Sequence, residues 1–121
     1  MKVRKARIAN VYTVLNLVDR KLELGFVIQF YDNDNNLGIS FKEEHEGDLD
    51  TFYSLMELYH GDKLCFLEEL LNKDIWVLQG NPHGIAFAKP YTDRWVVVNA
   101  EDRFYNEDEV REILISKNQG E

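Results

Sequence analysis

The chain has few of the residues that cross-link or interrupt a small protein. Among 121 residues there is one cysteine, Cys65, and there are two prolines, Pro82 and Pro90. A single cysteine excludes an internal disulfide, and the apolar neighbours of Cys65 predict that it packs as a small hydrophobic side chain. Because we find no repeat, low-complexity tract or linker, we expect one domain over residues 1–121.

Basic charge is also scarce. The chain has 14 Lys and Arg residues against 22 Asp and Glu residues, which gives a net charge of −8. Such a surface disfavours nucleic-acid polymers and anionic membranes as partners. No apolar stretch follows the basic amino terminus that would serve as a signal peptide or cross a membrane. We therefore expect a cytoplasmic protein with no membrane partner and no nucleic-acid polymer partner.

Motifs of catalysis are missing from the sequence. It contains no nucleophile elbow, phosphate loop, zinc-ligand spacing or paired-carboxylate signature. Its histidines, His45, His60 and His83, are scattered and form no recognisable pattern with Cys65. We therefore predict a protein that is not an enzyme, with no catalytic residue, no metal site and no cofactor.

The segment from Asp32 to Glu43 has two competing interpretations. Its oxygen-bearing side chains fall where a calcium loop has ligands, at Asp32, Asp34, Asn36, Ser40 and Glu43. However, Leu37 occupies the place that requires glycine, and Gly38 comes one position late. The flanking residues alternate between apolar and polar, which is the period of a strand. We predict a β-hairpin with residues 32–36 as its turn, and calcium binding is the alternative.

Apolar alternation predicts strands in the rest of the chain. The predicted strands comprise residues 5–17, 22–31, 37–41, 75–78, 85–87 and 95–98. Trp76 lies in one of them, where it is predicted to pack in the core. The turn-forming residues 80–84 join two of these strands into a second hairpin.

Three helical segments are predicted between and after these strands. Asp48 is the expected cap of the first helix, which ends near Gly61, and Asp62 is the expected cap of a short helical turn. Asn106 and Glu109 form the pattern of a capping box at the start of a closing helix. The expected fold class is α+β, with a mainly antiparallel sheet of about five to six strands and two to three helices packed on it.

Aromatic and arginine side chains are interleaved towards the carboxyl end. The candidate ligand-binding residues are Tyr91, Arg94, Trp95, Arg103, Phe104 and Arg111. Aromatic faces stack on bases and guanidinium groups bond phosphate oxygens in pairs, so this mixture suits a small anionic nucleotide. The same residues could instead complete the core and form surface ion pairs with neighbouring carboxylates.

Several segments are similar to a family of small phage proteins. The similarity is carried by Lys5-Ala6-Arg7-Ile8, the helix at residues 52–59, the run from Gly61-Asp62-Lys63 to Leu70-Leu71-Asn72-Lys73-Asp74-Ile75-Trp76-Val77, and Asp93-Arg94-Trp95. Over nearly its whole length the chain loosely resembles the anti-Thoeris sponge proteins, which capture the cyclic ADP-ribose-type signal of bacterial TIR proteins. It departs from them at Asn72, where the family has glycine, and in a glycine-rich segment reduced to Gly38. No binding residue is carried over from the family.

The resemblance implies a phage counter-defence protein in the host cytosol. It would bind and sequester a small cyclic nucleotide without turning it over, and we expect a homo-oligomer. The alternative is an acidic protein-binding inhibitor or adaptor that blocks a host defence protein, with exposed aromatic residues as its anchor. Salt-sensitive capture of a protein partner, without binding of a small molecule, would distinguish the alternative.

Overall fold

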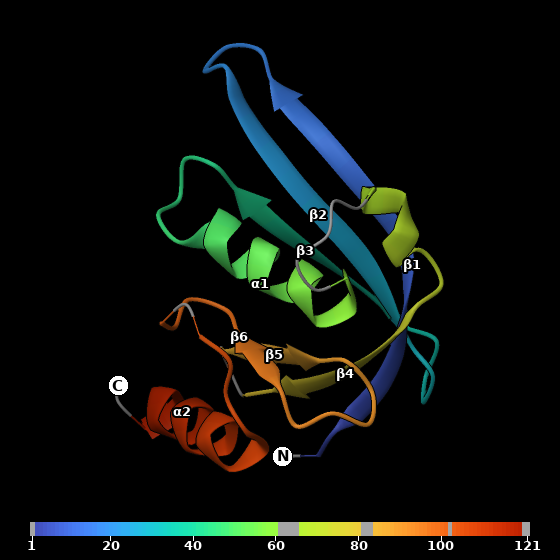
Figure 1. Cartoon of the computed structure of the whole chain (residues 1–121), viewed down its shortest axis with the longest axis vertical. Coiled ribbons are helices and arrows are strands. Elements are labelled where there is room, and N and C mark those ends of the chain that lie inside the picture. The colour runs from blue at the N-terminus through green and yellow to red at the C-terminus, as the bar shows by residue number, and fades with distance from the viewer. Residues whose placement is uncertain (1, 61–65, 81–83, 102, 120–121) are drawn as a thin grey trace.

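The structure is a computed structural model that describes residues 2–60, 66–80, 84–101 and 103–119. In chain order the elements are β1 (Arg4–Asn16), β2 (Lys21–Phe30), β3 (Asn36–Lys42), α1 (Asp48–His60), the 3₁₀ helix η1 (Leu67–Leu70), β4 (Asp74–Gln79), β5 (Ile85–Ala88), β6 (Trp95–Val97) and α2 (Glu107–Gln119). The strands form one six-stranded antiparallel sheet (Figure 1). The predicted α+β class, with helices packed on an antiparallel sheet, is confirmed.

Two meanders are joined edge to edge in this sheet. The strand order is β3-β2-β1-β4-β5-β6, and the join is the antiparallel pairing of residues Arg4 to Arg7 in β1 with residues Asp74 to Val77 in β4. These two segments lie far apart in the sequence. Local alternation predicted the strands, and turn residues predicted the hairpins at residues 32–36 and 80–84, whereas the pairing between the two meanders depends on contacts that no local pattern contains.

The sheet curls around the first helix. The rings of Phe26 in β2 and Phe87 in β5 have centroids 5.6 Å apart, although β1 and β4 lie between those strands in the sheet. In a flat sheet three strand spacings would separate them by roughly 14 Å. Phe41 of β3 also contacts Phe52 of α1, with centroids 5.3 Å apart. One hydrophobic core therefore fills the concave face beneath α1.

A second hydrophobic cluster lies on the opposite face of β4, β5 and β6. Its fully buried members include Leu78 and Ala86 from the sheet and Val110 and Leu114 from α2. These three strands are therefore covered on both faces, by α1 on one side and by α2 on the other. This arrangement explains why their sequences are almost continuously apolar.

The segment that resembled a calcium loop is the turn of a β-hairpin, as predicted. β2 and β3 pair in antiparallel register on either side of it, and no helix enters it. Asp34 takes a left-handed conformation with φ of 58°, and Asn33 Oδ1 accepts a hydrogen bond from Asn35 N–H at 3.0 Å. Arg4 donates to both carboxylate oxygens of Asp32, at 2.9 and 3.1 Å, so this carboxylate belongs to an ion pair.

The two predicted helix caps have different outcomes. Asn106 Oδ1 accepts from Glu109 N–H at 2.9 Å and Glu109 Oε1 accepts from Asn106 N–H at 3.1 Å, which confirms the capping box of α2. Asp48 instead is the first residue of α1, and its Oδ2 accepts from Lys42 N–H at the end of β3. The expected helix end at Gly61 and cap at Asp62 lie outside the described residues.

Candidate functional site

Trp95 and Phe104 pack against different hydrophobic clusters and are buried to different extents. Trp95 begins β6 and is 1% exposed, and its backbone forms an isolated bridge with Tyr105. The bridge hydrogen bonds are 2.8 and 2.9 Å long. Tyr105 therefore covers the edge of β6 at Trp95, and the Trp95 side chain packs in the second cluster, where its face is closed to a ligand. Phe104 is only partly buried, against the first cluster.

Arg103 and Arg111 are held in ion pairs with carboxylates of α2. Arg103 Nη2 lies 3.0 Å from Glu109 Oε2 and its guanidinium lies 3.8 Å from the centroid of the Tyr105 ring. Arg111 Nε lies 2.9 Å from Glu107 Oε2, one helical turn away. The hydrogen bond from Asn106 N–H, and then that from Arg103, lower the pKa of Glu109. A phosphate that bound these arginines would have to displace carboxylates that are already in place.

Arg94 is exposed, as is Arg103, and the guanidinium of Arg94 lies 4.0 Å from the centroid of the Phe104 ring. Within the described part of the chain its guanidinium forms no ion pair. Arg94 and Phe104 are thus a predicted pair that the structure brings together, with a cation stacked on an aromatic face.

Tyr91 lies against β4. Its side chain is 86% exposed, its φ is 65°, and its ring meets that of Trp76 edge to face with centroids 5.2 Å apart. A cavity of about 60 Å³ lies beside this pair and is also lined by Tyr31 and Asp74. That volume is far below the several hundred Å³ of a typical ligand pocket. Trp76, which was expected in the core, is partly buried against the second cluster.

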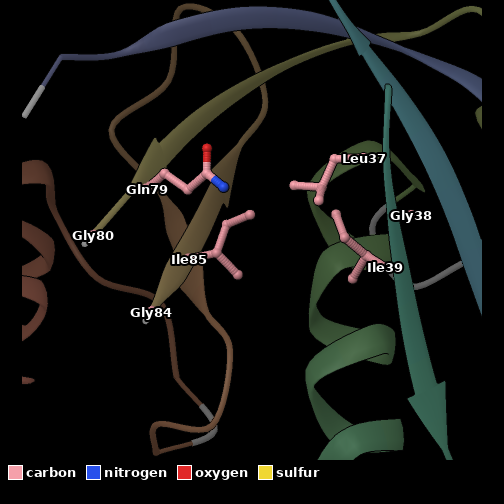
Figure 2. A pocket seen from close by; sticks show the side chains of 7 residues that line it. All are labelled: Leu37, Gly38, Ile39, Gln79, Gly80, Gly84 and Ile85. Atoms are coloured by element: carbon pink, nitrogen blue, oxygen red, sulfur yellow. The ribbon is translucent and has the colours of Figure 1, made fainter. Parts of the chain in front are cut away.

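A larger hollow lies where the curled sheet brings β3 close to the β4–β5 hairpin. It has a volume of about 280 Å³ and is lined by Leu37, Gly38, Ile39, Gln79, Gly80, Gly84 and Ile85. Figure 2 shows the side chains of Leu37 and Ile39 on one wall facing those of Gln79 and Ile85 on the other. We call this hollow the β3 groove.

The backbone of β3 is satisfied by β2 on one side only. Phe30 N–H donates to the carbonyl of Asn35 at 2.9 Å, and at the other end Glu43 N–H donates to the carbonyl of Leu22 at 2.9 Å. Since hydrogen-bonded pairs alternate along an antiparallel ladder, every second residue of β3 bonds to β2. The residues whose backbone groups point away from β2 are Asn36, Gly38, Ser40 and Lys42.

These outward groups form the free edge of the sheet. Lys42 N–H is taken by Asp48 Oδ2 at 3.0 Å. Among residues 2–60, 66–80, 84–101 and 103–119, the outward backbone groups of Asn36, Gly38 and Ser40 have no protein partner. At Gly38 a Cβ atom would meet nothing within 4 Å, so the outer face of β3 is also open at this residue. This edge and the apolar walls of the groove together suit an extended peptide.

The described lining of the groove has binding chemistry. It combines apolar side chains, one amide and glycine backbone, and among these described residues there is no acid, base or nucleophile. The described residues contain no group of three or more His, Cys, Asp and Glu side chains placed to hold a metal. No helix in the described part of the chain is long and apolar enough to cross a membrane.

The sequence contained a signal for this groove that its interpretation did not use. Gly38 interrupts an alternating strand, and Gly80 and Gly84 lie on either side of the turn of the β4–β5 hairpin opposite it. A glycine within a strand often marks a place where another backbone approaches closely. That the two glycine-containing segments face each other depends on the curl of the sheet. Comparison of the chain with protein-family models, with curated proteins and with solved structures found no match.

Proposed function

We propose that this protein is a binding protein that captures an extended segment of a partner protein in the β3 groove. It acts as an inhibitor or adaptor, without chemical turnover. The observation that carries this proposal is the free edge of β3, where the outward backbone groups of Gly38 have no partner among the described residues, beside a groove of about 280 Å³. A strand added there would bond to β3 through its backbone and place alternate side chains against the groove walls.

Charge around the groove indicates the kind of segment that fits. Asp34 precedes β3, and Glu43 and Glu44 follow it, all of them exposed, in a chain of net charge −8. The walls themselves are apolar at Leu37 and Ile85. The partner segment is therefore extended, with alternating apolar residues and with Lys or Arg near its ends. Opposite charge accelerates the encounter, and backbone pairing with apolar contact holds the complex.

Selection from a library of short random peptides tests the proposal. Gly38→Pro removes the outward N–H of β3, whereas Gly38→Ala keeps it and adds a methyl group into open space. We expect wild type and Gly38→Ala to enrich alternating apolar peptides with basic ends, and Gly38→Pro to bind the selected peptides at least tenfold more weakly. Equal binding by folded Gly38→Pro would show that β3 is not the recognition edge.

A second candidate function is sequestration of a cyclic ADP-ribose-type nucleotide, favoured by one specific observation. The guanidinium of Arg94 is exposed, stacked on Phe104 and free of ion pairs within the described residues. A panel of linear and cyclic nucleotides tests it by thermal unfolding, with calcium and chelator controls, because a ligand of the native state raises Tm. A shift with a cyclic ADP-ribose isomer that is recovered intact, and that is lost in Arg94→Ala, would support sequestration. No shift would leave the peptide-binding proposal as the sole candidate.

A further inference from the structure

The sheet has another unpaired stretch of strand, on β1. β4 pairs with β1 only over residues Arg4 to Arg7. Just beyond, Ile8 N–H donates to the carbonyl of Lys73 at 2.9 Å, and the Ile8 carbonyl accepts from Asn72 N–H at 2.8 Å. From there to Asn16, β1 has only β2 as a strand neighbour. The β1–β2 hairpin therefore projects beyond the rest of the sheet, as Figure 1 shows.

We call this projecting part of the β1–β2 hairpin the arm. The hydrogen-bond pattern between its two antiparallel strands determines which of its backbone groups are free. Residues of β2 that bond to β3 cannot also bond to β1, so the β1 residues opposite them point away from β2. On the arm these residues are Val11, Thr13 and Leu15. Asn10 Oδ1 accepts from Val11 N–H at 2.9 Å. Within the part of the chain that the structure describes, the outward groups of Thr13 and Leu15 have no protein partner.

The arm is also unusually apolar for an exposed edge. The exposed fractions rise towards its tip, with Val14 at 44%, Leu15 at 65%, Leu17 at 81% and Val18 at 92%. No charged residue occurs from Ile8 to Val18, although 30% of the chain is charged. Natural proteins usually protect an open edge with charge, proline or a covering element. η1 contacts β1, but within the described residues the stretch from Thr13 to Leu15 has no charge, no proline and no backbone partner on this side. Such an edge is suited to being covered by another strand.

We propose that the free edge of β1 pairs with the same edge of a second copy of this chain, antiparallel about a two-fold axis at Thr13. In this register Val11 lies opposite Leu15 of the second copy on the inner face. Tyr12 lies opposite Val14 of the second copy on the outer face, and Asn10 lies opposite Asn16 of the second copy at the ends. Apolar residues thus meet apolar residues and amides meet amides.

The self-complementary register favours a second copy over an unrelated strand. A two-fold axis requires each edge to match its own reverse, and the segment centred on Thr13 does so. Pairing of aromatic with β-branched side chains, and of threonine with threonine, is favourable across antiparallel strands. Self-association of a chain with net charge −8 normally meets repulsion, and an uncharged contact segment keeps that repulsion at a distance. The pairing contributes about four to six backbone hydrogen bonds.

Sedimentation equilibrium and light scattering on the purified chain test this pairing. We expect the wild type to have twice the monomer mass of 14.2 kDa, and Thr13→Pro to have the monomer mass because its outward N–H is gone. Leu15→Lys, which adds a charge at the edge, is the second variant should Thr13→Pro not fold. Gly38→Pro is the matched control, since it blocks the free edge of β3 and leaves β1 intact. A monomeric wild type up to millimolar concentration, or dimeric Thr13→Pro, overturns the proposal.

Cross-linking tests the register itself. The two-fold axis places the two Thr13 residues in a hydrogen-bonded pair, with Cα atoms about 5.5 Å apart, within the range of a disulfide. Thr13→Cys is expected to form a covalent dimer under mild oxidation, faster than the wild type with its native Cys65. Tyr53→Cys, at another exposed site, on α1, is the control and stays uncross-linked. Equal cross-linking of both variants would contradict the register. The proposed dimer does not rest on the proposed function of the β3 groove, and the two proposals can fail separately. Thr13→Pro changes the free edge of β1 and leaves the β3 groove intact, whereas Gly38→Pro changes the β3 edge and leaves β1 intact.

Discussion

Substitution of Gly25 by alanine probes the packing of the outer face of the sheet. Gly25 lies opposite Tyr12 on β1 and Ser40 on β3. The Tyr12 ring covers it, and the Tyr12 hydroxyl lies 2.7 Å from Ser40 Oγ. A Cβ atom on Gly25 would lie 2.3 Å from Tyr12 Cζ and 2.5 Å from the carbonyl oxygen of Ile39. Both distances are about 1 Å shorter than an ordinary contact.

The loss of stability in Gly25→Ala depends on which atoms have to move to make room for the new Cβ atom. Tyr12 can rotate away, and the hydrogen bond with Ser40 is then lost, which removes about 1 kcal/mol. The Ile39 carbonyl is backbone of β3, so relief there shifts the strand pairing, and such overpacking costs about 1–3 kcal/mol. We expect Gly25→Ala to lower the free energy of unfolding by about 2–3 kcal/mol. For a chain of 121 residues, a loss of about 2 kcal/mol lowers Tm by roughly 8 °C.

Urea unfolding followed by tryptophan fluorescence and circular dichroism measures this change. Gly38→Ala is the matched control, because Gly38 lies on the same face of the neighbouring strand and a Cβ atom there meets nothing within 4 Å. We expect the control to be as stable as the wild type or slightly more stable. Adding Tyr12→Ala to Gly25→Ala isolates the part of the cost that comes from the Ile39 carbonyl. If Gly25→Ala and Gly38→Ala unfold at the same urea concentration, the geometric argument is wrong.

Two further predictions concern the start of α2. Asn106→Ala removes the side-chain acceptor of Glu109 N–H, so we expect urea unfolding to show a loss of about 1 kcal/mol, with Asn106→Ser retaining most of the stability. The pKa of Glu109 lies below its ordinary value of 4.5, because Glu109 accepts from Asn106 N–H and from Arg103. Its contribution to stability is therefore complete above the unfolded pKa and lost as pH falls through the folded pKa. Unfolding midpoints measured from pH 7 to pH 3 should fall less for Glu109→Gln than for the wild type, and parallel curves would contradict this assignment.

Most secondary structure could be predicted because its causes are local. Alternation around Phe26 predicts a strand whichever neighbour it later receives, and the Asn106–Glu109 capping box is complete within one helical turn. The hairpin at residues 32–36 was preferred over a calcium loop for the same reason, since the alternation of its flanks is a local property. Asp48 is the exception, because its hydrogen-bond partner, the Lys42 N–H, belongs to the preceding strand.

The predicted ligand residues show what a one-dimensional pattern omits. Tyr91, Arg94 and Trp95 are neighbours in the sequence, yet they have different surroundings in the structure. Tyr91 meets Trp76, Arg94 stacks on Phe104, and Trp95 is buried under α2. Strand direction and the bend before β6 determine these differences. The nucleotide-binding hypothesis is still a prediction, with Arg94 as the arginine of the set that forms no ion pair within the described residues.

The sequence alone determined which segments are strands and helices, because hydrophobic period and capping depend on residues a few positions apart. It also determined the apolar, uncharged character of residues 8–18 and the acidic surface as a whole. Only the tertiary structure decided that β1 pairs with β4 and that the sheet curls until Phe26 meets Phe87. It also decided that, among the described residues, the outward backbone of β3 and of the β1 arm is left unpaired. Those features arise from contacts between distant segments competing for the same core, and the β3 groove and the free arm of β1 exist only as their consequence.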